Sequence, residues 1–93
     1  MDAERDYWKT FFLNWPAKLA RRGLAVAGYD EQIPFVAFLT HDDFVLLQRM
    51  APDAMGARVV ILPYDQIVAV KLTEVVKQQV LSDAGFEGKL SKQ

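Results

Sequence analysis

The stretch FVLLQRMAPDAMGARVVILPYDQIVAVKL, residues 44–72, decides the fold of this chain. Three runs of apolar and often β-branched residues lie within it, at 44–49, 57–62 and 66–72. Such runs are typical of β-strands when turn-forming residues separate them. The separators here are a loop at 50–56, with proline, aspartate and glycine, and a tight turn at 63–65. Connections this short join antiparallel strands, so we expect three of them in this stretch.

Two further strands are expected upstream of this stretch. They are Leu24–Ala27 and Ile33–Thr40, separated by the turn Gly28–Glu31. Pro34 has no backbone N–H, so it must lie at the start, at an edge or in a bulge of its strand. Gly23 either ends a helical turn or opens the first strand, which begins at Ala17 or at Gly23. Five short strands without βαβ alternation favour a small, strongly bent, five-stranded antiparallel barrel over about residues 23–72.

An amphipathic helix is expected before the strands, over about residues 2–15. Four large rings follow the spacing i, i+3, i+4 and i+7, which places them on one stripe. They are Trp8, Phe11, Phe12 and Trp15. Asp2 is a suitable N-cap, and Pro16 ends the helix near Trp15. The stripe either caps the core of its own domain or docks on a neighbouring subunit or protein partner.

The tail, residues 73–93, carries a weaker pattern. Val75, Val76, Gln79 and Val80 allow one or two helical turns, and the glycines that follow stop any helix. The 93 residues are expected to form one domain. Its fold class is mainly β with an N-terminal helix, a small barrel and a short helical or frayed tail.

Composition narrows the classes of function. Eleven basic and twelve acidic residues give a net charge of −1, so no strong overall field draws the chain to nucleic acid or a membrane. The absence of cysteine excludes disulfides, thiolate metal sites and cysteine nucleophiles. No apolar run approaches the ~20 residues of a membrane span, and the acidic start is unlike a secretory signal. We therefore expect a cytoplasmic protein without membrane contact.

The expected strands are apolar on both faces, whereas the interior of one small barrel takes the apolar side chains of only one face. A single helix shields only part of the remainder, and a large exposed apolar surface is unfavourable for a soluble monomer. We therefore expect a homo-oligomer formed by pairing of strand edges. The expected interface residues are Val59, Val60, Ile61, Leu62, Val68 and Val70.

Side chains for catalysis or metal binding are sparse. His41 is the only histidine, and although Asp42 and Asp43 follow it, adjacent residues in a turn point apart. A structural metal site usually takes three or four ligands. Both serines lie in the tail, so no nucleophile triad can be placed on a rigid scaffold. We expect no catalytic residue, no metal and no cofactor, and hence no enzyme.

A local basic surface is the stronger functional candidate. Arg49 and Arg58 flank the loop at 50–56 and are expected near each other across the hairpin. Tyrosines in two turns, Tyr29 and Tyr64, offer rings for stacking on bases. The expected nucleic-acid contacts are Lys18, Arg21, Arg22, Arg58 and Tyr64. The alternative is ordinary solvated surface charge.

The strand order, turn lengths and two motifs resemble the Sm-like (Hfq-like) superfamily of small β-barrels, over roughly residues 8–72. The first motif is DFVLL at 43–47 and the second is PYDQI at 63–67, with a very short turn between two strands. The end of the helix, FLN at 12–14, and the following Arg21-Arg22 add to the resemblance. Where RNA-binding members carry Tyr-Lys-His, this chain has Tyr-Asp-Gln.

The resemblance implies a bent barrel of the Sm-like or Src-homology-3-like type and a ring of subunits, more than it implies an RNA chaperone. Two functions stand as alternatives. The first is an Sm-like homo-oligomer that binds RNA through its basic residues. The second is a protein-interaction or scaffolding barrel without nucleic-acid binding, which the net charge and Asp65 favour.

Overall fold

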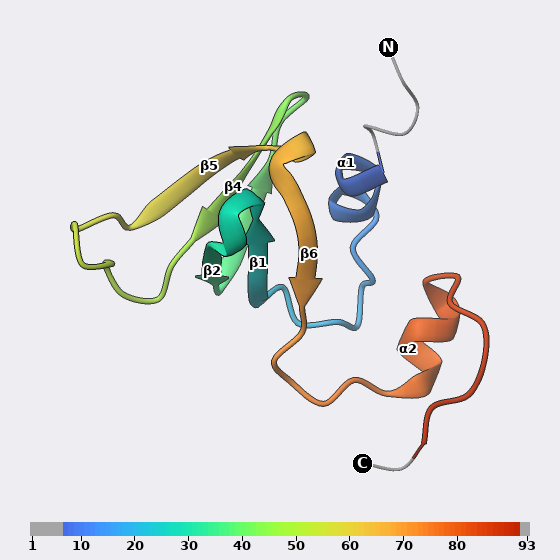
Figure 1. Ribbon diagram of the computed structural model, residues 1–93. Helices are drawn as coiled ribbons and strands as arrows, with labels where there is room; N and C mark the ends of the chain where they lie inside the picture. Colours follow the sequence, from blue (N-terminus) through green and yellow to red (C-terminus); the bar gives the residue numbers. More distant parts are fainter. Residues whose placement is uncertain (1–6, 92–93) are drawn as a thin grey trace.

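The computed structural model describes residues 7–91 and is mainly β with an N-terminal helix, as the sequence predicts. Figure 1 shows the strands at the centre, α1 beside β6, and α2 set away from the sheets. The elements are α1 (Tyr7–Leu13), β1 (Gly23–Ala27), the 3-10 turn η2 (Gly28–Asp30), β2 (Gln32–Phe35), β3 (Ala37–Thr40), β4 (Phe44–Gln48), β5 (Val59–Pro63), the 3-10 turn η3 (Tyr64–Gln66), β6 (Ile67–Lys71) and α2 (Gln78–Asp83).

Half of the predicted aromatic stripe lies in the core of the chain, one ring from helix α1 and one from just after it. The helix ends at Leu13, and the predicted N-cap Asp2 lies outside the described residues. Trp15, just after the helix, stacks on Phe12 with 5.6 Å between ring centroids, and its indole N–H donates to the Leu19 carbonyl at 3.1 Å. One interpretation of the stripe was that it docks on a partner. Because Phe12 and Trp15 are buried, these two rings are not available for such docking.

The strands form two antiparallel sheets of three, ordered β2-β1-β6 and β3-β4-β5. The sequence predicts one strand at 33–40, whereas the structure divides it into β2 and β3 at Val36, which gives six strands instead of five. The Val36 N–H donates to the Gln48 carbonyl at 2.8 Å, so the chain stays attached to β4 through the break. This bend sends the two halves of one predicted strand into different sheets.

The sheets are not closed into the predicted barrel. Within residues 7–91, β5 pairs only with β4, and β6 pairs only with β1. The three-residue turn η3 carries the chain from one sheet directly to the far edge of the other, so β5 and β6 follow each other in sequence without pairing. An opening therefore remains between these two strands.

The core lies between the two sheets and α1. Alternate residues of β4, Val45 and Leu47, are completely buried, in one hydrophobic cluster with the rings of Phe12 and Trp15. Phe38 meets Phe12 at 4.9 Å and Trp15 at 5.0 Å between ring centroids. Edge-to-face ring pairs of this kind add to the stability that burial alone supplies.

Two residues of the first sheet meet specific backbone requirements. Strand β1 begins at Gly23 and not at Ala17, which decides between the two predicted starts. A Cβ at Gly23 would lie 2.5 Å from the Lys71 carbonyl oxygen, so the close approach of β1 to β6 requires glycine. Pro34 lies on β2, an edge strand of its sheet, as predicted.

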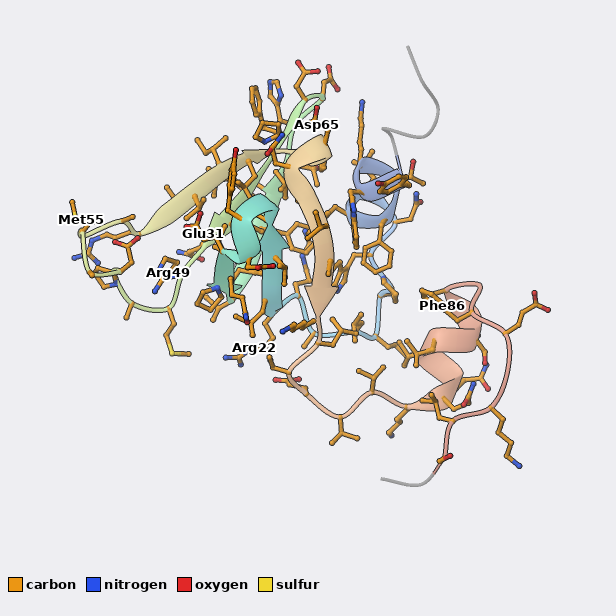
Figure 2. All side chains as sticks on the ribbon, viewed as in Figure 1. Arg22, Glu31, Arg49, Met55, Asp65 and Phe86 are labelled. Atoms are coloured by element: carbon orange, nitrogen blue, oxygen red, sulfur yellow. The ribbon has the colours of Figure 1, made fainter. Side chains whose placement is uncertain are left out.

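The loop between β4 and β5 is a compact turn held by one carboxylate. Asp53 Oδ1 accepts the N–H of Ala57 at 2.8 Å and that of Met55 at 2.9 Å. These two N–H groups, with Ala57 the larger contributor, hold the pKa of Asp53 below its ordinary 3.8. Met55 at the tip is 93% exposed, and Figure 2 shows it at the end of the loop farthest from the sheets.

The tail forms helix α2 and then folds back on it. The side-chain amide of Gln78 donates to the Gly88 carbonyl at 3.2 Å and accepts the Leu90 N–H at 2.8 Å. Gly85, with a φ of 100°, follows the helix in a conformation that L side chains rarely adopt. Val80 is buried and joins α2 to the hydrophobic core.

Candidate functional site

The two strand edges at the opening are the main candidate site. An unpaired strand edge presents backbone N–H and C=O groups that can pair with another chain. Val59 and Ile61 of β5 are 47% and 58% exposed, and Val68 of β6 is 62% exposed. Native edges are usually protected by charge, proline or cover, and these three positions carry apolar side chains instead.

The remaining predicted interface residues lie on the inner face of the same strands. Val60 pairs with Leu47 and Leu62 pairs with Val45, both buried, so these two side chains of β5 face the core. Val70 of β6 faces the core as the partner of buried Ala25. All three are half-buried, because nothing among the described residues continues the sheet beyond them.

An apolar row crosses the outer face of the second sheet and ends at the β5 edge. Leu39, Leu46 and Ile61 stand in register on β3, β4 and β5, and Leu39 is 66% exposed. Phe44 lies beside this row in a shallow depression of the surface. The prediction that the strands are apolar on both faces therefore holds for this sheet.

An apolar groove of about 340 Å³ borders β6. Its walls come from α1, from the end of β6 and from the C-terminal segment, and no charged side chain lines it. The lining includes Trp8, Phe11, Val70, Leu72, Leu81 and Phe86. Trp8 and Phe11 are the two rings of the predicted stripe that remain accessible to a partner.

The sequence prediction missed Leu81 and Phe86 as part of a site. The tail showed only a weak helical pattern, and the groove that it lines together with α1 depends on tertiary structure. The available signal was the position of these two large apolar side chains on either side of Gly85, where a helix end folds the chain back.

Arg21, one of the predicted nucleic-acid contacts, is engaged within the chain. Its guanidinium carbon lies 3.9 Å from the centroid of the Phe38 ring, and Nη2 donates to the Phe38 carbonyl at 3.3 Å. The cation–π contact covers a core aromatic residue with a charged group. A change at Arg21 would therefore alter packing as well as charge.

Arg22, another predicted contact, lines an open pocket of about 370 Å³ together with Arg49. The Arg49 N–H donates to the Arg58 carbonyl at 2.9 Å, which places these two residues side by side as predicted. Lys18 and Arg22 line a second pocket. Arg22 also pairs with Glu74 at 3.6 Å, so part of its charge is compensated. Figure 2 shows Arg22 and Arg49 on the same lower side of the sheets.

The structure places the two candidate stacking tyrosines differently. Tyr64 is only 5% exposed, and its hydroxyl donates to the His41 carbonyl at 3.1 Å. Its ring is therefore not available for the stacking on a base that the sequence predicted. Burial raises the pKa of Tyr64 above its ordinary 10.0. Tyr29 is fully exposed, in a left-handed backbone conformation with φ 72°.

His41 takes part in the structure of its turn. Its Nδ1 accepts the Asp43 N–H at 3.1 Å, and its carbonyl accepts the Tyr64 hydroxyl. Across residues 7–91, no three His, Asp or Glu side chains lie close enough together to hold a metal ion. In the same range, neither helix has the length and apolar character needed to cross a membrane.

Comparison of the chain with protein-family models, with curated proteins and with solved structures found no match. The features of this chain that bear on function are its strand edges, its groove and its basic residues.

Proposed function

We propose that this chain is an assembly-forming small β-protein of the Sm-like or Src-homology-3-like type, in which β5 of one copy pairs with β6 of the next. The observation that carries the proposal is the pair of unpaired edges with exposed apolar side chains, Val59 and Ile61 on one and Val68 on the other. The proposed role is assembly and binding, without catalysis.

The two edges complement each other in direction and chemistry. Strands β5 and β6 are joined by η3 alone, and every strand pair within the chain is antiparallel. Antiparallel pairing of β5 with β6 of another copy would satisfy both rows of backbone groups. It would also place Val60 and Leu62 on the same face of the joint sheet as Val70 of the neighbour. Each of these three side chains is half-buried in the single chain.

The proposed contact is heterologous, because different surfaces of the two copies meet. Such a contact repeats from copy to copy, and it ends in a closed ring when the rotation per subunit divides a full turn. A ring leaves no exposed β5 or β6 edge. This removes the aggregation risk that open apolar edges carry.

The test measures the mass of the untagged protein by native mass spectrometry and size-exclusion chromatography. We expect the wild type to form one closed oligomer and Ile61→Lys to shift it to monomer, because a lysine on the edge must lose solvent on pairing. Leu39→Lys is the matched control, since Leu39 stands in the same apolar row but on β3, at the side of the sheet opposite β5. A monomeric wild type at tens of micromolar would contradict the proposal, as would an equal effect of both variants.

RNA binding is the second candidate function, supported by the pocket that Arg22 and Arg49 share with Arg58 beside it. In a ring this basic surface would recur once per subunit. We expect weak binding of short uridine-rich or adenosine-rich RNA that falls steeply with salt concentration.

Its test compares Arg22→Glu with Arg49→Glu in one chain against Lys9→Glu with Lys89→Glu, which changes the net charge equally at positions outside the pocket. The first variant should lose at least tenfold in affinity at low salt, and the second much less. If the wild type binds no RNA at low salt, the protein-interaction or scaffolding role remains.

A further inference from the structure

Two features of this molecule lie at opposite ends and are not explained by strand pairing alone. One is the loop between β4 and β5, residues 49–58, with Met55 at its tip. The other is the apolar groove, with Phe86 on one wall. Figure 2 shows Met55 and Phe86 on opposite sides of the sheets, so the loop of a chain cannot enter its own groove.

The loop is built to present apolar side chains in a fixed geometry. Besides the two bonds to Asp53 Oδ1, the Asp53 N–H donates to the Ala57 carbonyl at 3.0 Å and the Gly56 N–H to the Asp53 carbonyl at 2.9 Å. This network fixes the tip without burying any of it. Met50 and Met55 are both largely exposed, and an exposed methionine on a rigid turn favours an interaction role over a structural one.

The groove has the complementary chemistry. Its walls carry aromatic and aliphatic side chains and no charge, and the rings of Trp8 and Phe11 pack edge to face at 5.9 Å. A methionine thioether contacts the edges and faces of such rings favourably, and its flexible chain fits an irregular cavity. The groove volume of about 340 Å³ is several times that of one methionine side chain, so it can take the loop tip.

The direction of the strands brings the two features together across the proposed contact. In an antiparallel pair, the first residue of one strand lies opposite the last residue of the other. Val59, which opens β5, directly follows the loop, and Leu72 on the groove wall directly follows the last residue of β6. Met55 precedes Val59 by four residues, a reach of up to about 13 Å.

We propose that the loop at 49–58 of one copy docks its Met55 tip into the α1–β6–α2 groove of the next copy. The occupant of the groove is thus a second copy of this chain, and the C-terminal segment takes part in assembly through Leu81 and Phe86. This inference rests on the proposed assembly and adds to it a second contact between neighbours, outside the strand ladder.

The experiment uses the natural absence of cysteine, so every disulfide that forms joins two introduced positions. The full chain carrying Met55→Cys and Phe86→Cys is mildly oxidised, and the linked peptides are identified by mass spectrometry. We expect a 55–86 disulfide between chains. The control carries Met55→Cys and Tyr29→Cys, because Tyr29 is more exposed than Phe86 but its turn lies at the start of β6, away from the groove.

A second measurement leaves the groove unchanged, because Phe86→Cys could itself disrupt the groove. Met55→Asp should weaken assembly at least tenfold in native mass spectrometry, while Met55→Leu should stay within about threefold of the wild type. The side chain of Met55 is almost free of contacts within the chain, so neither change should affect folding.

The outcomes separate this inference from the proposed assembly. If the wild type is oligomeric but Met55→Asp assembles normally and no 55–86 link forms, the docking is wrong and the strand pairing stands. Links between two copies of residue 55 alone would indicate an isologous contact and also overturn the docking. A monomeric wild type overturns both.

Discussion

At the scale of single residues, Tyr29 holds the least favourable backbone conformation in the described chain. Its φ of 72° and that of Asp30, 62°, are both left-handed, in a turn where the Ala27 N–H donates to the Glu31 carbonyl at 2.8 Å. A left-handed conformation costs an L residue about 1–2 kcal/mol, least for asparagine and glycine. The exposed ring contributes little packing to offset this cost.

Replacing Tyr29 with asparagine should therefore raise the free energy of unfolding by about 0.5–1 kcal/mol, measured by urea denaturation. Tyr29→Ala is the control, because alanine keeps the left-handed cost while it removes the same ring. An alanine variant as stable as the asparagine variant would show that removal of the ring, and not backbone strain, is the cause.

Among the glycines of this chain, Gly23 is the one where an added Cβ would clash with the backbone. A Cβ there would meet the Lys71 carbonyl oxygen at 2.5 Å, so β1 and β6 would have to separate. Gly23→Ala should lower the free energy of unfolding by about 1–3 kcal/mol. Gly28→Ala, whose Cβ would find its nearest neighbour at an ordinary 3.6 Å, should change it much less in the same denaturation experiment. Equal losses of unfolding free energy in the two variants would contradict the view that β1 and β6 approach too closely for a Cβ at Gly23.

The chemistry of single residues predicted backbone positions better than it predicted the contacts of side chains. The missing N–H of Pro34 restricted it to the start, an edge or a bulge of its strand, and it lies on an edge strand, because that constraint is local. The expectation that the Tyr64 ring is accessible was wrong. A tyrosine in a turn can point either into solvent or into the core, and here its ring lies against Phe12 in the core. The contact of Arg21 with Phe38 depends on the tertiary fold in the same way.

At the scale of elements, the loop between β4 and β5 depends on the charge of Asp53. Its carboxylate accepts two N–H groups, which stabilise the ionised form and lower its pKa below 3.8. Because the pKa of Asp53 is lower in the folded state than in the unfolded state, this stabilisation is fully present at a pH above the unfolded-state pKa. It is lost as the pH falls through the folded-state pKa. Asp53→Asn keeps the accepting oxygen but removes the charge.

The difference in unfolding free energy between wild type and Asp53→Asn should thus be constant above about pH 5 and shrink below pH 3.8. Thermal denaturation of both proteins across this range measures it. Asp83→Asn is the control for acid effects elsewhere, since that carboxylate accepts a side-chain amide in α2 and is outside the loop. A difference that persists unchanged to pH 2.5 would contradict the assignment.

Strand positions could be predicted to within one or two residues, because turn chemistry bounds them on both sides. The division of one predicted strand at Val36 could not, since no turn-forming residue marks it in the sequence. Phe35 and Phe38, on either side of the break, are both buried. The same holds for the open edge between β5 and β6. Closure depends on strand tilt and register across the whole sheet, which no local pattern records.

At the scale of the whole molecule, the proposed assembly uses two different edges, and this makes it testable by mixing variants. Ile61→Lys blocks the β5 edge and leaves β6 intact. Val68→Lys blocks the β6 edge and leaves β5 intact. Each variant alone should be monomeric, because every contact needs one edge of each kind.

Mixed in equal amounts, the two variants should form a heterodimer through the intact β5 of the Val68→Lys chain and the intact β6 of the Ile61→Lys chain. Growth stops there, because both remaining edges carry lysine and repel each other. Native mass spectrometry distinguishes this dimer by isotope labelling of one variant. An isologous contact that pairs like edges would instead give homodimers of each variant through its intact edge, and no preference for the mixed species.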